Sequence, residues 1–207
     1  MKKLLLLLLP LFIVFGCTSE GDIKIINRTD HYLYFNIKGT DYVLEGSEIS
    51  DPSKTISIDT GSQFLFLGDD ETSVAMQLEG ETFMMQDADL FGIPNGLFFT
   101  ETTLTVKPNE TMKIYCDATH AGVKLINNSL VDVAEFSYYT DSSDSLISLI
   151  DYPVISGDSI WSRLKATTSY DSIVYSFVIE YENGLYDSSY ADFDDLIVDE
   201  QLRIDLQ

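Results

Sequence analysis

The chain has 207 residues, of which 34 are acidic and 12 are basic, and its formal net charge is −22. A charge of this sign and size repels nucleic acid and anionic lipid, so the composition predicts no nucleic-acid partner. The length is sufficient for one large β-sandwich or two small ones. The 12 tyrosines and 12 phenylalanines favour strands over helices.

The N-terminus has the pattern of a secretory signal. Lys2 and Lys3 precede an apolar run from Leu4 to Phe15, which is the order of charged and apolar regions in an export signal. The run is shorter than the about 20 residues that a membrane-spanning helix needs, and Pro10 lies inside it. We therefore expect residues 1–16 to be a signal peptide.

The end of this run, Val14-Phe15-Gly16-Cys17, resembles the lipobox of bacterial lipoproteins. The resemblance implies that Cys17 becomes the acylated first residue of the mature protein, and that the lipid bilayer is a partner through acyl chains such as palmitate. More than one acyl chain makes such an anchor stable. Thr18, rather than Asp, follows the cysteine, which by the same resemblance favours the outer membrane of the bacterial envelope. Residues 17–22 are expected to form a tether.

Two pairs of similar segments indicate an internal repeat. Ile23–Thr29 matches Val123–Ser129, and Glu110–Cys116 matches Glu200–Leu206. Each unit therefore opens on an apolar strand that ends in Asn and a hydroxyl residue, and closes on a strand of alternating character. The expected repeats are 23–117 and 123–207, and the expected domains are 23–118 and 119–207.

Strands are also predicted inside both units. Alternating apolar residues predict half-buried strands at Thr55–Asp59 and Thr103–Lys107, and the apolar run Phe64–Leu67 predicts a strand buried on both faces. Alternation over 173–181 predicts a long strand, and Asn183-Gly184 predicts the tight hairpin that follows it. Together they predict an all-β fold of two tandem antiparallel β-sandwiches.

Segment 142–150 is open to a second interpretation, because it could form a short helix capped by Ser142 or Ser143.

This architecture resembles the immunoglobulin-like modules of bacterial surface and periplasmic lipoproteins. In such modules the opening strand ends in Asn-x-Thr/Ser, as at Asn27 and Asn127, and a later hairpin carries Asn-Gly. The immunoglobulin cysteine pair is absent, and Trp161 is the only candidate for the central tryptophan. The resemblance implies a fold rather than a function.

Few residues of the chain suit catalysis. The only two histidines, His31 and His120, have no second ligand at metal-binding spacing, and we expect both to be exposed polar residues. With Cys17 acylated, Cys116 has no disulfide partner, and its apolar surroundings predict a buried, inert thiol. No hydrolase, metalloprotease or phosphate-loop motif occurs. The sequence therefore predicts no enzyme activity and no cofactor.

Acidic clusters could bind calcium through oxygen ligands. Asp87–Gly92 has acids and a glycine at the spacing of a calcium loop, but Phe91 stands where a ligand is required. Asp69–Glu71 and the group Asp192, Asp194 and Asp195 are more plausible as loose surface sites, although solvated loops are the simpler interpretation. We expect no metal site.

The segment from Met84 to Phe99 is the strongest candidate for a functional surface. It is apolar, contains Gly and Pro, and lies in the longer of the two repeats. Its large apolar residues either belong to core strands or form an exposed loop that marks a partner site. These residues are Phe91, Ile93, Leu97, Phe98 and Phe99.

Our first hypothesis is a non-catalytic envelope lipoprotein that acts as a binding, assembly or structural module, with a protein or glycan partner. The alternative is a carbohydrate- or peptide-binding accessory lipoprotein, in which Tyr138, Tyr139, Trp161 and Tyr170 form a stacking face. A third, hydrolytic hypothesis requires a cleft that holds His31 or two close carboxylates.

Overall fold

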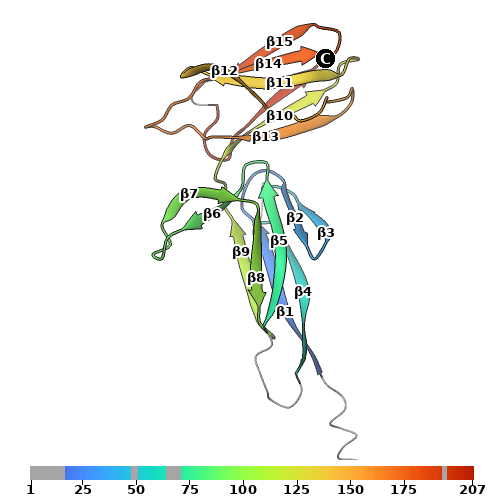
Figure 1. Ribbon diagram of the computed structural model, residues 1–207, viewed down its shortest axis with the longest axis vertical. Helices are drawn as coiled ribbons and strands as arrows, with labels where there is room; N and C mark the ends of the chain where they lie inside the picture. The colour runs from blue at the N-terminus through green and yellow to red at the C-terminus, as the bar shows by residue number, and fades with distance from the viewer. Residues whose placement is uncertain (1–16, 48–50, 64–70, 193–194) are drawn as a thin grey trace, which may run out of the picture.

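The computed structural model describes residues 17–47, 51–63, 71–192 and 195–207. Over these residues it contains strands and no helix, which confirms the predicted all-β fold (Figure 1). The expected signal peptide 1–16, the predicted strand Phe64–Leu67 and the acids Asp69, Asp70 and Asp194 lie outside the described residues.

The first domain, residues 17–116, is a sandwich of two sheets with an additional hairpin. Its strands are β1 (Cys17–Asn27), β2 (Leu33–Ile37), β3 (Thr40–Leu44), β4 (Ser53–Gln63), β5 (Thr72–Gly80), β6 (Met85–Ala88), β7 (Pro94–Phe99), β8 (Glu101–Val106) and β9 (Thr111–Cys116). One sheet has the order β4-β1-β9 and the other β3-β2-β5-β8, while β6 and β7 pair only with each other.

The second domain, residues 121–206, is a sandwich of the same kind. Its strands are β10 (Ala121–Asn127), β11 (Val133–Thr140), β12 (Ser143–Ser148), β13 (Ser159–Leu164), β14 (Tyr175–Tyr181), β15 (Tyr186–Ala191) and β16 (Gln201–Leu206). The sheets have the orders β13-β10-β16 and β12-β11-β14-β15. Strand for strand, these orders match the two sheets of the first domain, and the β6–β7 hairpin is the additional element of the first domain.

The opening and closing strands of each domain pair in the same register. Asn27 at the end of β1 lies opposite Cys116 at the end of β9, and Asn127 on β10 lies opposite Leu206 on β16. Both pairs are parallel, whereas the other paired strands of the described residues are antiparallel. The strands matched in sequence therefore occupy matching positions in the fold.

Residues 17–22, expected to form a lipidated tether, are part of β1. Cys17 lies opposite Gln63 on β4, and the pairing continues to Ile26 opposite Ser53, with a register shift between Ser19 and Glu20. The tether prediction is wrong because a signal peptide indicates where a mature chain begins, and carries no information on where its first strand starts.

Segment 142–150 forms a strand rather than the alternative helix. β12 pairs with the edge of β11, with Ser148 opposite Ser137, and every residue of β12 is exposed. The hairpin predicted at Asn183-Gly184 is confirmed between β14 and β15, and Gly184 adopts the positive φ (78°) that a tight turn requires.

Each domain has its own hydrophobic core between its two sheets. Every second residue of β5 is buried, as expected for a strand with one face on the core. Cys116 is fully buried in the first core, and Leu206 occupies the equivalent place in the second. Burial raises the pKa of the Cys116 thiol to about 12, which keeps it in the unreactive protonated form. The prediction of a buried thiol is confirmed.

A buried asparagine closes the opening strand of the first domain. Asn27 Nδ2 donates to the carbonyl oxygens of His31 (2.8 Å) and Glu45 (2.7 Å). Its Oδ1 accepts from the backbone N and the Oγ1 of Thr29, both at 3.0 Å. All four hydrogen-bonding positions of the amide are therefore used, which is the condition for burying it without loss of stability.

Asn127 repeats this arrangement in the second domain. Its Nδ2 donates to the carbonyl oxygens of Val131 (3.0 Å) and Val154 (2.9 Å), and its Oδ1 accepts from the backbone N (3.2 Å) and Oγ (2.6 Å) of Ser129. The Asn-x-Thr/Ser signature is therefore a structural device that ties a strand end to two neighbouring loops.

Replacing Asn127 with Ala is expected to lower the free energy of unfolding by about 3 kcal/mol, because it deletes four hydrogen bonds at a fully buried position. Urea denaturation measures the change. The control is Asn128→Ala at the exposed neighbouring position, where we expect a change within about 0.5 kcal/mol. Equal losses in the two variants would show that the buried amide has no special role.

Candidate functional site

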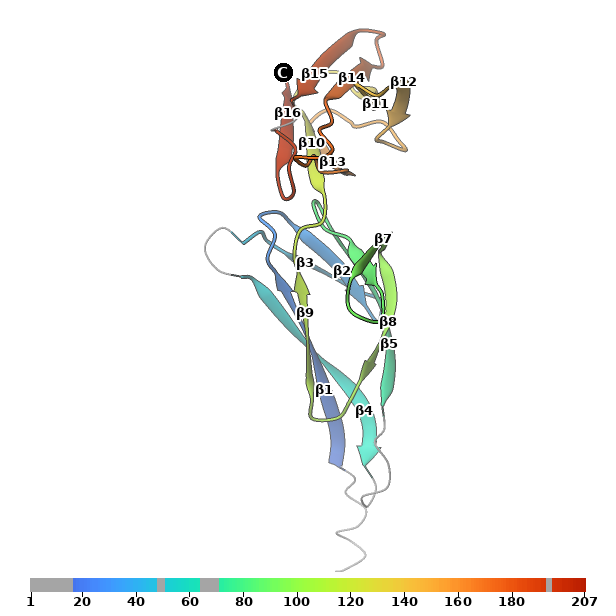
Figure 2. The same ribbon diagram turned by 90° about the vertical axis from the view of Figure 1, so that its left-hand side faces the viewer.

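The two domains are stacked end to end, and the β5–β6 turn of the first domain contacts the second (Figures 1 and 2). Glu81 in this turn has only 1% of its surface exposed. Its carboxylate accepts hydrogen bonds from Lys124 Nζ (3.1 Å) and Gln201 Nε2 (2.9 Å) of the second domain. Tyr34 of the first domain donates a further, longer bond (3.3 Å). A buried carboxylate is stable only with such compensation for its lost hydration.

Tyr34 also packs on the second domain through its ring. The ring stacks on Trp161 with centroids 5.6 Å apart and an interplanar angle of 5°. Burial, followed by the negative charge of Glu81, raises the pKa of Tyr34 to about 12, so the phenol remains a donor to the carboxylate. The guanidinium group of Arg163 lies over the Trp161 ring, 5.3 Å from its centroid. Arg163 also donates to Glu79 Oε2 of the first domain at 2.9 Å.

Asp199 of the second domain makes the reciprocal contacts to the first. Its Oδ1 accepts from Thr82 Oγ1 (2.7 Å) and its Oδ2 from the backbone N of Asp30 (3.0 Å). Its carbonyl oxygen accepts from His31 Nε2 at 2.7 Å. Asp199 has a φ of 73°, an unfavourable conformation for a residue with a side chain, and these contacts hold it there.

His120 is also part of this region. Its backbone N donates to the carbonyl oxygen of Thr82 (3.0 Å), and its ring meets the edge of Phe98 with centroids 4.6 Å apart. Burial, and then the charge of Arg163, lowers the pKa of His120. The expectation that both histidines are exposed is wrong, because His31 and His120 are half-buried where the domains meet.

We call these contacts the domain junction, and its principal side chains are Tyr34, Glu79, Glu81, Thr82, Lys124, Trp161, Arg163, Asp199 and Gln201. Its polar contacts are directional, and a displacement of one domain would leave buried polar groups without partners. The junction therefore favours one relative orientation of the two domains.

The residues expected to form an aromatic stacking face do not lie together. Trp161 belongs to the domain junction, and Tyr138 packs against the second core and the ring of Tyr175. Tyr139 is exposed on β11, while Tyr170 is fully exposed in the loop between β13 and β14. The sequence could not show that Trp161 lies at the domain junction, because the ring on which it stacks, Tyr34, belongs to the other domain.

A different group of tyrosines shares one face of the second domain. Strand pairing aligns Tyr139, Ser176 and Tyr190 across β11, β14 and β15, and Tyr186 lies on the same side of β15 as Tyr190. Tyr186 and Tyr190 are both about two-thirds exposed. Sequence reasoning missed both, although the period of two after the Asn183-Gly184 turn is a usable signal.

The β6–β7 hairpin carries the segment singled out in the sequence. Residues 86–98 are all exposed, and Phe91 is 88% exposed at the tip. Phe98 lies against His120, and Phe99 is half-buried at the base of the hairpin. Of the two interpretations left open, the exposed one therefore applies to Phe91, Ile93 and Leu97, and Phe99 lies nearest the core.

Local hydrogen bonds hold the hairpin tip in shape. Asp89 Oδ1 accepts from the backbone N of Phe91 (2.8 Å) and of Ile93 (2.9 Å), and Gly92 adopts a φ of 77°. Asn95 Nδ2 donates to Asp87 Oδ2 at 2.6 Å. The carboxylates that resembled a calcium loop thus serve the turn, and the described residues contain no group of three or more His, Cys, Asp or Glu that could hold a metal.

An apolar groove continues from the base of the hairpin into the side of the first sandwich. It has a volume of about 390 Å³ and lies where β8 and β9 each have a free edge. Leu97 lies on the same face of β7 as Phe99, which lines the groove, because successive strand residues alternate. Its apolar lining residues include Met84, Met85, Phe99, Leu104, Ile114 and Tyr115.

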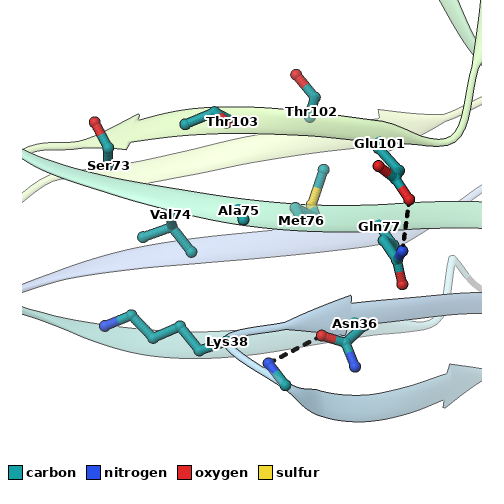
Figure 3. A pocket seen from close by; sticks show the side chains of 11 residues that line it. Asn36, Lys38, Ser73, Val74, Ala75, Met76, Gln77, Glu101, Thr102 and Thr103 are labelled. Carbon is teal, nitrogen blue, oxygen red and sulfur yellow. Dashed lines mark hydrogen bonds between the residues drawn. The ribbon is translucent and has the colours of Figure 1, made fainter.

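A larger and more polar groove, of about 630 Å³, lies over the β2-β5-β8 part of the first domain. Figure 3 shows its short side chains, among them Ser73, Ala75 and Thr103, and the longer Lys38 and Glu101. Gln77 Nε2 donates to Glu101 Oε1 at 2.7 Å across its end. The groove presents hydroxyl and amide groups rather than an acid–base pair.

No family model matches the sequence, and a search of curated proteins gives no significant match. Distant structural likenesses extend to the Bacillus anthracis TIE protein (10% identity, TM-score 0.31), covering 91% of this chain and 34% of that one. The likeness to the major pilin T3.2 of Streptococcus pyogenes (10% identity, TM-score 0.25) covers 92% of this chain and 98% of that pilin. The likeness to the minor pilin GBS52 of Streptococcus agalactiae (11% identity, TM-score 0.26) covers 90% of this chain and 94% of that pilin.

This chain spans about a third of the length of the TIE protein. At these TM-scores the likenesses carry no inference about function. The described residues contain no helix that is long and apolar enough to cross a membrane.

Replacing Glu81 with Gln removes the charge that Lys124 faces while keeping the shape of the side chain. We expect the parent protein to unfold in one calorimetric transition and the variant in two, because the junction no longer couples the domains. The Tm of at least one domain should fall. The control is Asp144→Asn at an exposed position of β12, which should leave the calorimetric profile unchanged. A wild-type profile for Glu81→Gln would exclude a coupling role for the carboxylate.

Proposed function

We propose that this protein is a non-catalytic binding or assembly module of the bacterial envelope, held in the outer membrane by acylated Cys17. The observation that carries the proposal is the β6–β7 hairpin, whose apolar tip is exposed to solvent and held in one shape by its own hydrogen bonds. A rigid apolar projection loses little conformational entropy on binding and is typical of an interaction surface.

The arrangement of the chain is consistent with an anchor at one end. β1 begins at the end of the first domain that is remote from the second domain (Figures 1 and 2). A lipid attached at Cys17 would therefore leave the hairpin and the second domain away from the membrane surface. The domain junction would keep the hairpin in a constant position relative to both domains.

The residues best suited to nucleophilic or acid–base chemistry have structural roles. The Cys116 thiol is buried, with a pKa of about 12. His31 donates to Asp199 and His120 packs against Phe98. These assignments support a binding role rather than a hydrolytic one.

The second candidate is a carbohydrate-binding accessory lipoprotein. Tyr139, Tyr186 and Tyr190 lie on one sheet face with serines between them, and aromatic rings beside hydroxyl groups suit the mixed surface of a sugar. Binding of a neutral polysaccharide that is lost in Tyr190→Ala, and retained in Tyr170→Ala, would favour this candidate.

The proposal is tested in the producing bacterium with a photo-crosslinking residue at position 91 and labelled palmitate. We expect label on the protein, and a discrete crosslinked adduct with an envelope component. Cys17→Ser should abolish both label and adduct, because the protein is no longer held at the membrane. A crosslinker at the fully exposed position Tyr170 is the matched control and should give no such adduct.

Label retained by Cys17→Ser would contradict the anchor. Equal adducts from positions 91 and 170, or none from either, would contradict the hairpin as the binding surface.

A further inference from the structure

The hairpin tip and the apolar groove form one surface, which we call the hairpin surface. Its exposed tip residues are Leu90, Phe91 and Ile93, and Leu97 lies between them and Phe99, which lines the groove. The β6–β7 hairpin pairs with no further strand, and the apolar face of such a hairpin normally packs on a sheet or helix. Here Leu90 and Phe91 are 101% and 88% exposed, and Ile93 and Leu97 are about 60% exposed, so burial of these side chains contributes little to the fold. Contact with another molecule would give these side chains a role.

The charged side chains of the β6–β7 hairpin itself are all acidic. The sequence contains no Lys, Arg or His between Lys54 and Lys107, a range that includes β5 to β8. Glu79 and Glu81 in this range face Arg163 and Lys124 in the domain junction.

In the groove, Asp117 pairs with Arg28 (3.5 Å), but the two acids of the hairpin have neutral partners instead. Asp87 accepts from Asn95, and Asp89 accepts from the backbone amides of Phe91 and Ile93. The apolar tip is therefore flanked by two carboxylates, Asp87 and Asp89, whose charge is not compensated by a basic partner among the described residues. Such carboxylates favour a binding partner of positive charge.

We propose that the hairpin surface docks into an apolar pocket with a rim of Lys and Arg side chains on another protein. This inference rests on the proposed binding function and names the chemistry of the partner. The apolar residues of the tip supply the central contact, and Asp87 and Asp89 beside them face the basic rim.

The charge argues against two other occupants. A second copy carries the same net charge of −22, and its hairpin surface would present acids to acids. An anionic lipid surface is repelled for the same reason, and the hairpin projects near the domain junction rather than at the end where β1 begins (Figure 1).

The test uses the purified protein carrying Cys17→Ser, and two amphipathic peptide probes that differ only in Lys or Glu on the polar face. Fluorescence anisotropy measures binding of each probe. We expect the Leu/Lys peptide to bind, the Leu/Glu peptide not to bind, and the affinity to weaken between about 0.05 and about 0.5 M salt as screening increases.

The decisive comparison is the variant Leu90→Ser/Phe91→Ser/Ile93→Ser, which changes no charge. We expect its Kd for the Leu/Lys peptide to be at least about tenfold higher than that of the parent protein. The matched control is Leu130→Ser/Tyr152→Ser/Tyr170→Ser, three exposed apolar residues of the second domain, which should leave Kd unchanged. Circular dichroism verifies that both variants are folded.

Equal Kd values for the parent and the hairpin variant would overturn the proposal, because binding would then depend on charge alone. Equal binding of the Leu/Lys and Leu/Glu peptides would contradict the proposal that the partner has a basic rim. If the protein binds phosphatidylcholine vesicles and this binding requires the hairpin residues, the surface binds lipid instead. If sedimentation equilibrium shows a dimer that requires these residues, the surface binds a second copy of the chain instead. The crosslinking test at position 91 is independent of the peptide result, so failure of the basic rim is distinguishable from failure of the binding function.

Discussion

The buried carboxylate of Glu81 is the constraint on which the rest of the structure depends. It lies in a turn of the first domain, forms an ion pair with Lys124 of the second domain, and accepts a hydrogen bond from Gln201 of that domain. A carboxylate without water requires its donors at fixed positions, and here most of those donors belong to the other domain. The stacked pair of Tyr34 and Trp161 and the contacts of Asp199 surround this charge. The two sandwiches therefore behave as one body rather than as beads on a flexible linker.

The repeat explains why the junction and the hairpin occur where they do. Both domains use the same strand order, the same parallel pair of opening and closing strands, and the same buried asparagine. The first domain departs from the second at the end of β5, where the Glu81 turn and the β6–β7 hairpin replace the simple turn between β14 and β15. The same insertion thus forms the contact to the second domain and presents the apolar hairpin surface, which links the orientation of the domains to the position of that surface.

Much of the fold could be predicted from the sequence, because its signals are local. The matching ends of the two units identify paired strands, and Asn183-Gly184 identifies a hairpin by its backbone requirement. The junction could not be predicted in this way. Glu81 and Gln201 are far apart in sequence, and no periodicity shows that they meet. The β6–β7 hairpin is an intermediate case. In the sequence, Asp89 and Gly92 resembled an incomplete calcium loop, whereas in the structure the Asp89 carboxylate accepts hydrogen bonds from backbone amides of the turn. An Asp followed by a Gly three residues later is an equally good signal for a turn.

The most direct test of this account is a measurement of domain orientation in solution. Residual dipolar couplings from the backbone amides of each domain, recorded on the intact protein, give an alignment tensor for each domain separately. The account predicts that the two tensors agree in magnitude and orientation when each domain is placed as in the structure (Figures 1 and 2). Tensors of clearly different magnitude would show that the domains move independently, and would contradict the central role of the buried Glu81 carboxylate.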